Sequence, residues 1–148
     1  MARSLLGVLL LAAGCTEEEP AELGVPTSDC AGTVPFTAGM SQTTTSGATV
    51  TLVRASPAPP DVGDNSWTIE VGDAMGAREG LNVDVRPWMP LHGHGLSPSN
   101  YAGSDRGDGM YEFGTFDLIM PGTWEFTIDI DVDSESSDIA VFALCAEG

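Results

Sequence analysis

The chain has 148 residues and a formal charge of −17, with 22 acidic residues against five basic ones, all of which are arginine. So acidic a surface repels nucleic acid and anionic lipid headgroups, which makes nucleic-acid binding the least favoured function. About 100 residues follow residue 47, the usual size of one domain, and we therefore predict a single domain over 48–148.

The first fourteen residues have the pattern of a secretory signal, 1–14. Arg3 precedes an apolar run from Leu5 to Ala13, which is too short to span a bilayer. The ending "LLLAAGC" resembles the lipobox of bacterial lipoproteins, and this resemblance implies that Cys15 becomes the lipidated first residue of an exported protein. The alternative is an ordinary cleaved signal that leaves Cys15 free or removes it. Loss of Arg3 with the signal makes the mature chain one charge more negative.

Residues 15–47 are expected to form a solvated tether between the anchor and the domain. The acidic stretch "TEEEPAELGVPTSD" and the low-complexity stretch "SQTTTSG" have too few apolar residues to bury themselves. Several acyl chains would hold the protein durably at a membrane. Thr16 is not the aspartate associated with inner-membrane retention in some Gram-negative bacteria, so we expect the outer membrane where that envelope applies.

Cys30 and Cys145 are left as a pair if Cys15 carries lipid. Disulfides persist in an oxidising exported setting, and a bridge between these two would close most of the chain into one loop. The alternative is a pair of reduced thiols that act as soft metal ligands. It is less favoured because neither cysteine has another one close in sequence to help bind a metal.

Apolar and polar residues alternate with period two over most of the chain after residue 47. "SWTIEV" places Trp67, Ile69 and Val71 on one face, and "TWEFTIDIDV" does the same for Trp124 and Phe126, which predicts half-buried strands. "DIAVFALCA" is apolar on both faces, as expected of a central strand. The predicted strands cover 48–55, 66–71, 81–87, 109–120, 123–132 and 138–146.

The connections between these strands carry turn signals. Pro121 and Gly122 suit the central pair of a type II turn, which predicts a hairpin over 116–132. A reversal is expected at 103–109 and a proline-rich connection at 57–65. The segment from Trp88 to Ala102 has neither period and is predicted to be a long loop.

Six or seven short strands with almost no helix predict an all-β fold, an immunoglobulin-like β-sandwich of one domain. Trp67 and Trp124 are expected in its core. Trp88, at the mouth of the long loop, is expected to be the most exposed of the three tryptophans. We expect this domain to be a monomer.

The long loop contains the only two histidines of the chain, in "PWMPLHGHG". Copper(I) favours thioether sulfur and imidazole nitrogen. The loop offers one such sulfur and two such nitrogens, from Met89, His92 and His94. Two further methionines could approach from elsewhere in the fold, Met120 at the predicted hairpin turn and Met110 beside the predicted reversal. The motif therefore predicts a candidate copper site.

A second interpretation of the same motif needs no metal. A histidine in a loop rich in glycine and proline can hydrogen-bond a backbone carbonyl and hold the loop, while Met89 and Met120 plug the end of the sandwich. Two histidines separated by one residue are common by chance. The alternative to copper binding is thus a structural or interaction module of the cell envelope.

Other chemistries lack the residues that they need. Asp129, Asp131 and Asp133 have the spacing of a calcium loop, but its sixth and twelfth positions hold serine and alanine where an EF-hand needs glycine and glutamate. The sequence lacks G-x-S-x-G, H-E-x-x-H and any lysine, so we expect no catalytic activity. A blue-copper centre is disfavoured because only three residues follow Cys145 to supply nearby ligands.

Over roughly residues 65–145 the chain resembles the YtkA-like domain of exported bacterial proteins, which is related to the FixH family. The motifs that carry the resemblance are Met89-Pro90 before the glycine and histidine cluster, Gly109 and Tyr111, and Met120-Pro121-Gly122 with Trp124. This resemblance implies an immunoglobulin-like sandwich.

The resemblance also implies a function. FixH-type proteins are associated with copper delivery to respiratory oxidases, which implies Met89, His92 and His94 as ligands and Met120 as an outside contributor. FixH-type proteins carry a transmembrane helix, whereas this chain carries a lipobox. Copper binding or buffering in the envelope is therefore more strongly implied than a direct role in oxidase assembly.

Overall fold

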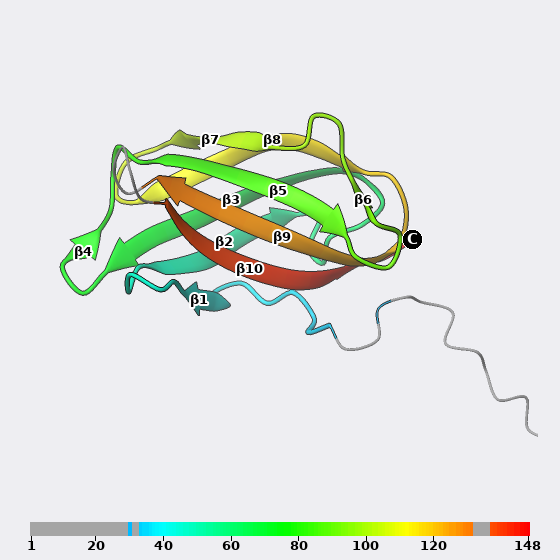
Figure 1. Cartoon of the computed structure of the whole chain (residues 1–148), viewed down its shortest axis with the longest axis horizontal. Helices are drawn as coiled ribbons and strands as arrows, with labels where there is room; N and C mark the ends of the chain where they lie inside the picture. Colours follow the sequence, from blue (N-terminus) through cyan, green and yellow to red (C-terminus); the bar gives the residue numbers. More distant parts are fainter. Residues whose placement is uncertain (1–29, 31–32, 132–136) are drawn as a thin grey trace, which may run out of the picture.

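The computed structural model describes residue 30 and residues 33–131 and 137–148, and all the regular elements in these ranges are β-strands (Figure 1). The predicted all-β fold is confirmed. Seven strands have five or more residues and three are shorter. They are β1 Ser41–Thr43, β2 Thr49–Ser56, β3 Gly63–Asp73, β4 Gly76–Ala77, β5 Asn82–Met89, β6 His94–Gly95, β7 Tyr101–Asp105, β8 Met110–Leu118, β9 Gly122–Asp131 and β10 Ser137–Ala146. The expected signal, Cys15 and part of the acidic run that begins at Asp129 lie outside the described residues.

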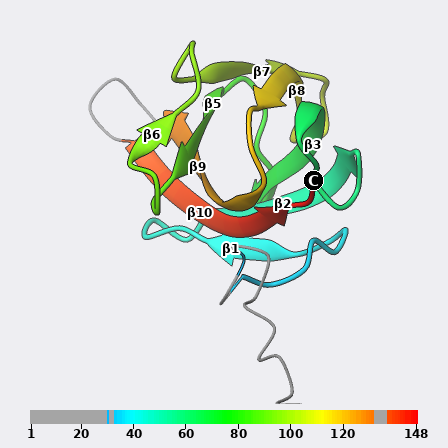
Figure 2. The same ribbon diagram turned by 90° about the vertical axis from the view of Figure 1, so that its right-hand side faces the viewer.

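The strands form two facing layers that are joined along one side (Figure 2). One layer contains β1, β2, β3 and β8, and the other contains β5, β9 and β10; neighbouring strands in both are antiparallel. β7 pairs with β5 through Ala102 and with β8 through Gly103, so it passes from one layer to the other. The predicted sandwich is confirmed, and β7 closes one of its sides in the manner of a barrel.

Alternate residues of the strands fill the space between the layers, as the period-two pattern predicts. Trp67 and Trp124 are 1% and 0% exposed, whereas Trp88 is 44% exposed, so all three tryptophans lie as predicted. Trp67 packs on Phe126 with ring centroids 4.2 Å apart and meets Phe116 edge to face at 5.7 Å. These aromatic contacts connect the two layers.

Pro121 and Gly122 do not form the predicted hairpin. β8 pairs with β3 and β7, whereas β9 pairs with β5 and β10, so this turn carries the chain from one layer to the other. Gly122 has a positive φ of 129°, as a glycine in a turn can adopt. The prediction was wrong because a type II turn splays paired strands, which suits a crossing between layers better than a two-residue hairpin.

β10 is an edge strand and not the predicted central strand. In the described part of the chain its ladder partner is β9, from Ser137 opposite Asp131 to Ala146 opposite Gly122. Burial alternates along it: Ile139 is 50% exposed and Val141 44% exposed, while the residues between them are buried. The outward face of β10 is apolar although it faces solvent. The prediction of a central strand was wrong because it assumed that an apolar face is a buried one.

Two predicted connections contain strands. β6 and β7 lie within the predicted loop 88–102, and β3 begins at Gly63 inside the predicted connection 57–65. The reversal at 103–109 is confirmed, since β7 and β8 pair on either side of it and the Arg106 N–H donates to the Met110 carbonyl at 2.8 Å. β6 and β7, with two and five residues, are too short to show a period in the sequence.

Residues 33–46, which we call the strap, run along the free edge of β10 (Figure 2). A disulfide between Cys30 and Cys145, with Cα atoms 5.3 Å apart, precedes the strap. At its other end Thr44 and Ser46 contact Asp138 at the start of β10. An uncovered edge strand is prone to pair with another chain, so the strap protects β10 from such pairing.

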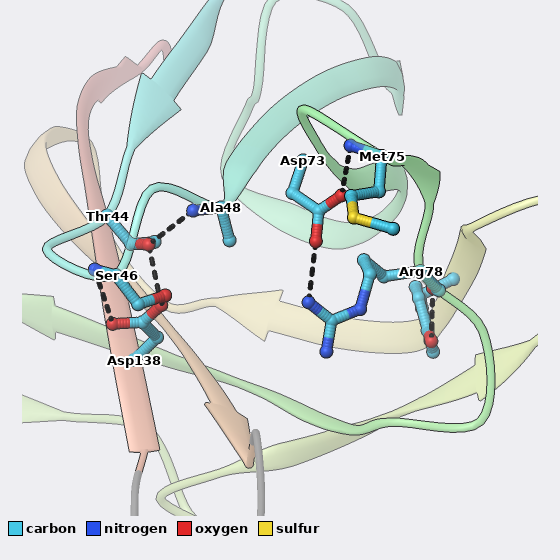
Figure 3. A network of polar contacts seen from close by, with 8 residues as sticks. Thr44, Ser46, Ala48, Asp73, Met75, Arg78 and Asp138 are labelled. Atoms are coloured by element: carbon cyan, nitrogen blue, oxygen red, sulfur yellow. Dashed lines mark hydrogen bonds and ion pairs between the residues drawn. The ribbon is translucent and has the colours of Figure 1, made fainter.

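The contact at the far end of the strap is a buried polar cluster (Figure 3). Asp138 is 6% exposed and accepts hydrogen bonds from Thr44 Oγ1 at 2.6 Å and from Ser46 Oγ. Thr44 Oγ1 also accepts the Ala48 N–H at 3.1 Å. Burial raises the pKa of Asp138, but the hydrogen bonds from Ser46 and Thr44 outweigh it and hold this pKa below its ordinary value.

We predict that Asp138 makes the stability of the fold fall at low pH. A lowered folded-state pKa stabilises the protein above the unfolded pKa of about 3.9, and this contribution is lost as the pH falls through the folded-state pKa. Asp138→Asn is expected to lower the free energy of unfolding at pH 7 by about 1–3 kcal/mol, because Thr44 and Ser46 lose a charged acceptor. Urea unfolding between pH 7 and pH 2 should show that the difference in free energy of unfolding between the parent protein and Asp138→Asn disappears toward pH 2. The control Asp64→Asn changes an exposed carboxylate and should have little effect; equal losses in both variants would contradict the prediction.

Candidate metal site

The histidine motif folds into a tight hairpin at the end of β5. Met89 pairs with His94 across it, and residues 90–93 form the turn. The Met89 carbonyl accepts hydrogen bonds from the N–H groups of His92 at 3.2 Å and Gly93 at 2.9 Å. Gly93 has a φ of +67°, which glycine adopts without steric cost. The histidines therefore belong to a defined hairpin and not to the irregular loop that the sequence predicts.

Met89 and His94 lie side by side on the face of the hairpin that is turned toward the core. Directly paired residues of antiparallel strands have Cβ atoms about 4.5–5.5 Å apart on the same face. Met89 is fully buried and His94 is half-buried. The His94 ring meets the buried Trp124 ring of β9 edge to face, with centroids 6.2 Å apart. One thioether and one imidazole of the predicted ligand set thus share the interior face of the hairpin.

His92 lies in the exposed turn, close to the second histidine. The ring centroids of His92 and His94 are 5.9 Å apart and the rings are inclined by 55°. The hairpin turn therefore brings both histidines of the chain together, as the motif predicts.

Of the two other candidate methionines, Met120 lies at this end of the sandwich and Met110 does not. Met120 is half-buried against the core, and its carbonyl accepts the Trp124 Nε1–H at 3.1 Å. Met110 begins β8, whereas Leu118 ends the same strand next to Met120. Because a nine-residue strand separates the two methionines, the structure excludes Met110 from the candidate site.

The surroundings of His94 orient its ring. His94 Nδ1 lies 3.4 Å from the Gly95 carbonyl oxygen, a long contact for a hydrogen bond. A carbonyl accepts only from a protonated nitrogen, so a hydrogen bond at this position would require the Nδ1–H tautomer, in which Nε2 keeps its lone pair. The same contact also matches the interpretation in which the histidine holds the loop.

Trp124 is the part of this site that sequence reasoning missed. It contacts both His94, through its ring, and Met120, through its Nε1–H. The sequence predicts a core position for Trp124 from its alternation and includes it in the motif with Met120-Pro121-Gly122, but neither signal indicates contact with a histidine. The contact with a histidine 30 positions earlier depends on the pairing of β5 with β9, for which the local sequence gives no signal.

A groove of about 430 Å³ lies on the outward side of the same hairpin. Trp88 and Leu96 line it, together with Arg86, whose guanidinium donates to Asp129 at 2.6 and 3.0 Å. The exposure of Trp88 could be predicted from the sequence. The groove could not, because Leu96 and Gly95 on its other side follow from the unpredicted strand β6.

The family comparison covers this whole region. The family model described as YtkA-like matches residues 42–129, which is more than half of the chain. The chain belongs to the YtkA-like family. The match includes Met89, both histidines and Met120, and it begins and ends earlier than the expected range of 65–145, so that β10 lies outside it. No curated protein and no solved structure matches this YtkA-like chain.

Two further observations concern the described part of the YtkA-like domain. Within the described ranges, no helix is long and apolar enough to cross a membrane. Across the same residues, no three histidine, cysteine, aspartate or glutamate side chains group together to hold a metal ion. Among the candidate ligands at the hairpin, Met89 carries a thioether sulfur, and thioether sulfur is a ligand that selects copper(I).

Proposed function

We propose that this YtkA-like protein is a non-catalytic lipoprotein of the cell envelope, anchored through Cys15, that binds or buffers copper(I). The observation that supports this most is the placement of His92 and His94 beside Met89 in one hairpin. The protein is proposed to act as a monomer, on the outer membrane in a Gram-negative envelope, with no nucleic-acid partner.

The separation of the two imidazole rings fits one shared ion. Metal–imidazole bonds are about 2.0–2.1 Å long, and a ring centre lies roughly 1 Å behind its nitrogen, so rings that share an ion have centroids within roughly 6 Å. The centroids of His92 and His94 are 5.9 Å apart. Met89, paired with His94, would supply the sulfur, and Met120 is the further sulfur at this end.

These donors suit a soft monovalent ion better than a hard one. Neutral imidazoles and thioethers carry no charge, whereas calcium and magnesium require oxygen ligands. The formal charge of −17 attracts cations to the protein at long range. Copper(I) would be the cargo of the site, held by soft ligands at the open end of the sandwich.

A copper(I) titration of the mature protein against a chromogenic chelator tests this proposal. We expect a sub-micromolar dissociation constant, and we expect the His92→Ala/His94→Ala variant to bind at least about a hundredfold more weakly, because second-shell changes alone cost 10- to 100-fold. Met89→Leu removes the sulfur with little change in volume, so affinity should fall while the core stays folded. Met75→Leu, in a distant exposed turn, is the matched control. Tight binding that survives loss of both histidines contradicts this ligand set.

A second function, a structural end-cap without metal, is favoured by two contacts of His94. Its ring packs on Trp124 and its Nδ1 approaches the Gly95 carbonyl. The same double-alanine variant separates the two functions. An end-cap requires that the variant melt at a lower temperature in metal-free buffer and that the parent protein bind no copper(I).

A further inference from the structure

Exposed apolar side chains occur in three separate connections at the end of the sandwich that holds the histidines, and the label β6 marks this end on the right in Figure 1. Leu91 in the β5–β6 turn, Ile119 after β8 and Val62 before β3 are 68, 57 and 41% exposed. Gly63 pairs with Leu118, so Val62 and Ile119 follow directly from neighbouring strand ends. We call Val62, Leu91 and Ile119 the apolar end. Single exposed apolar residues are common on proteins, whereas a group of them indicates a surface that another body covers.

The opposite end of the sandwich has a different character. Its turns are held by charged side chains: Asp105 accepts the Gly80 and Gly107 N–H groups at 2.6 and 2.8 Å, and Asp73 pairs with Arg78 at 2.7 Å (Figure 3). Met75, which is 95% exposed, also lies at this opposite end, but three exposed apolar side chains lie at the apolar end, which is therefore better suited to contact with a nonpolar phase.

The chain from the expected lipid anchor enters the fold at the apolar end. Cys30 is bound to Cys145, and Cys145 pairs with Thr123 at the start of β9, directly after the connection that contains Ile119. Val34, a few residues after Cys30, is itself 56% exposed. The disulfide thus fixes which end of the domain the tether reaches.

We infer that the apolar end rests on the lipid bilayer in which the acyl chains of Cys15 are inserted. This inference depends on the anchor in the proposed function and not on copper binding. Fifteen positions separate Cys15 from Cys30, and a random coil of that length spans roughly 20 Å on average, so the expected tether would keep the apolar end within reach of the headgroups. Contact with the bilayer is then intramolecular, and weak apolar contacts are enough to maintain it.

Charge predicts the kind of lipid that this surface contacts. Asp61 and Glu147 lie at the apolar end, where their backbones bridge, and the sequence contains no lysine. An acidic protein gains nothing from anionic headgroups, so the contact relies on apolar burial. Binding should therefore be stronger on zwitterionic phosphatidylcholine than on vesicles that contain phosphatidylglycerol.

Trp88 provides an intrinsic probe for this contact. It lies on β5 three residues before Leu91 and is 44% exposed, whereas Trp67 and Trp124 are buried. The mature chain can be coupled through Cys15 to a maleimide lipid while Cys30 and Cys145 are protected in their disulfide. In phosphatidylcholine vesicles with brominated acyl chains, we expect tryptophan emission to be quenched, and we expect Leu91→Ser/Ile119→Ser to lose at least half of this quenching.

Two controls make the experiment decisive. Met75→Ser changes a side chain that is 95% exposed at the opposite end and should leave the quenching unchanged. Trp88→Phe should abolish it, which assigns the signal to Trp88. Unquenched emission from the anchored wild-type protein overturns the inference, and so does equal quenching in the Leu91→Ser/Ile119→Ser variant. Either result would indicate that a protein partner, and not the bilayer, covers the apolar end. Because the coupling is chemical and no copper is present, this result is independent of natural lipidation and of copper affinity.

Discussion

Replacing Cys30 and Cys145 with serine is expected to lower the free energy of unfolding by about 4–5 kcal/mol. The two cysteines are 115 positions apart, so the disulfide closes a loop that includes nearly all of the described chain. A cross-link over so long a loop removes much of the conformational entropy of the unfolded state, about 4.7 kcal/mol for 100 residues. Equilibrium unfolding in urea, compared between the parent and the double-serine variant, measures the difference.

Cys15→Ser is the control for this experiment, since it removes a thiol that is not part of the bridge. It should leave the unfolding midpoint unchanged. In the Cys15→Ser background, mass spectrometry without reduction should find the Cys30 and Cys145 peptides linked and two hydrogens light. Titration of two free thiols in the folded protein would contradict the bridge and the stability that we assign to it.

Trp124→Ala is expected to cost about 3–5 kcal/mol of stability, the range for removal of a large buried aromatic side chain. Trp124 is fully buried at the end of the core nearest the histidine hairpin, and its Nε1–H donates to the Met120 carbonyl. The His94 ring also loses the surface against which it packs. Urea unfolding should show a lower midpoint, and copper(I) affinity should fall in the same variant.

Trp88→Ala is the matched control, because the same side chain is removed from the neighbouring strand on its outward face. Surface substitutions usually change stability by no more than about 0.5 kcal/mol, and Trp88 is 44% exposed, so its loss should have a small effect. Comparable losses in the two variants would contradict the assignment of Trp124 to the core.

Most of the strands could be predicted from the sequence because each buries one face. Trp67, Ile69 and Val71 show this period, and all three are buried. Pairing could not be predicted, since alternation reports which face of a strand is buried and not which strand lies beside it. For this reason Pro121 and Gly122 suggested a hairpin where the chain crosses between layers, and the apolar outward face of β10 suggested a central strand.

For the candidate site, too, contacts between residues close in sequence could be predicted and contacts that depend on strand pairing could not. Met89, His92 and His94 are close in sequence, so their proximity in the fold could be predicted from the motif alone. Met120 and Met110 could not be distinguished, because their distances from the histidines depend on which end of β8 each one occupies. Trp124 became part of the site only through the ladder between β5 and β9.

The disulfide also determines how the domain bears mechanical load. A pull on the chain before Cys30 passes through the sulfur bridge to Cys145 and then into the ladder of ten residue pairs between β10 and β9. β1, which has three residue pairs with β2, lies outside this load path. Part of a pull on the N-terminal chain therefore reaches β9, the strand that carries Trp124, through the last strand of the domain and without passing through β1.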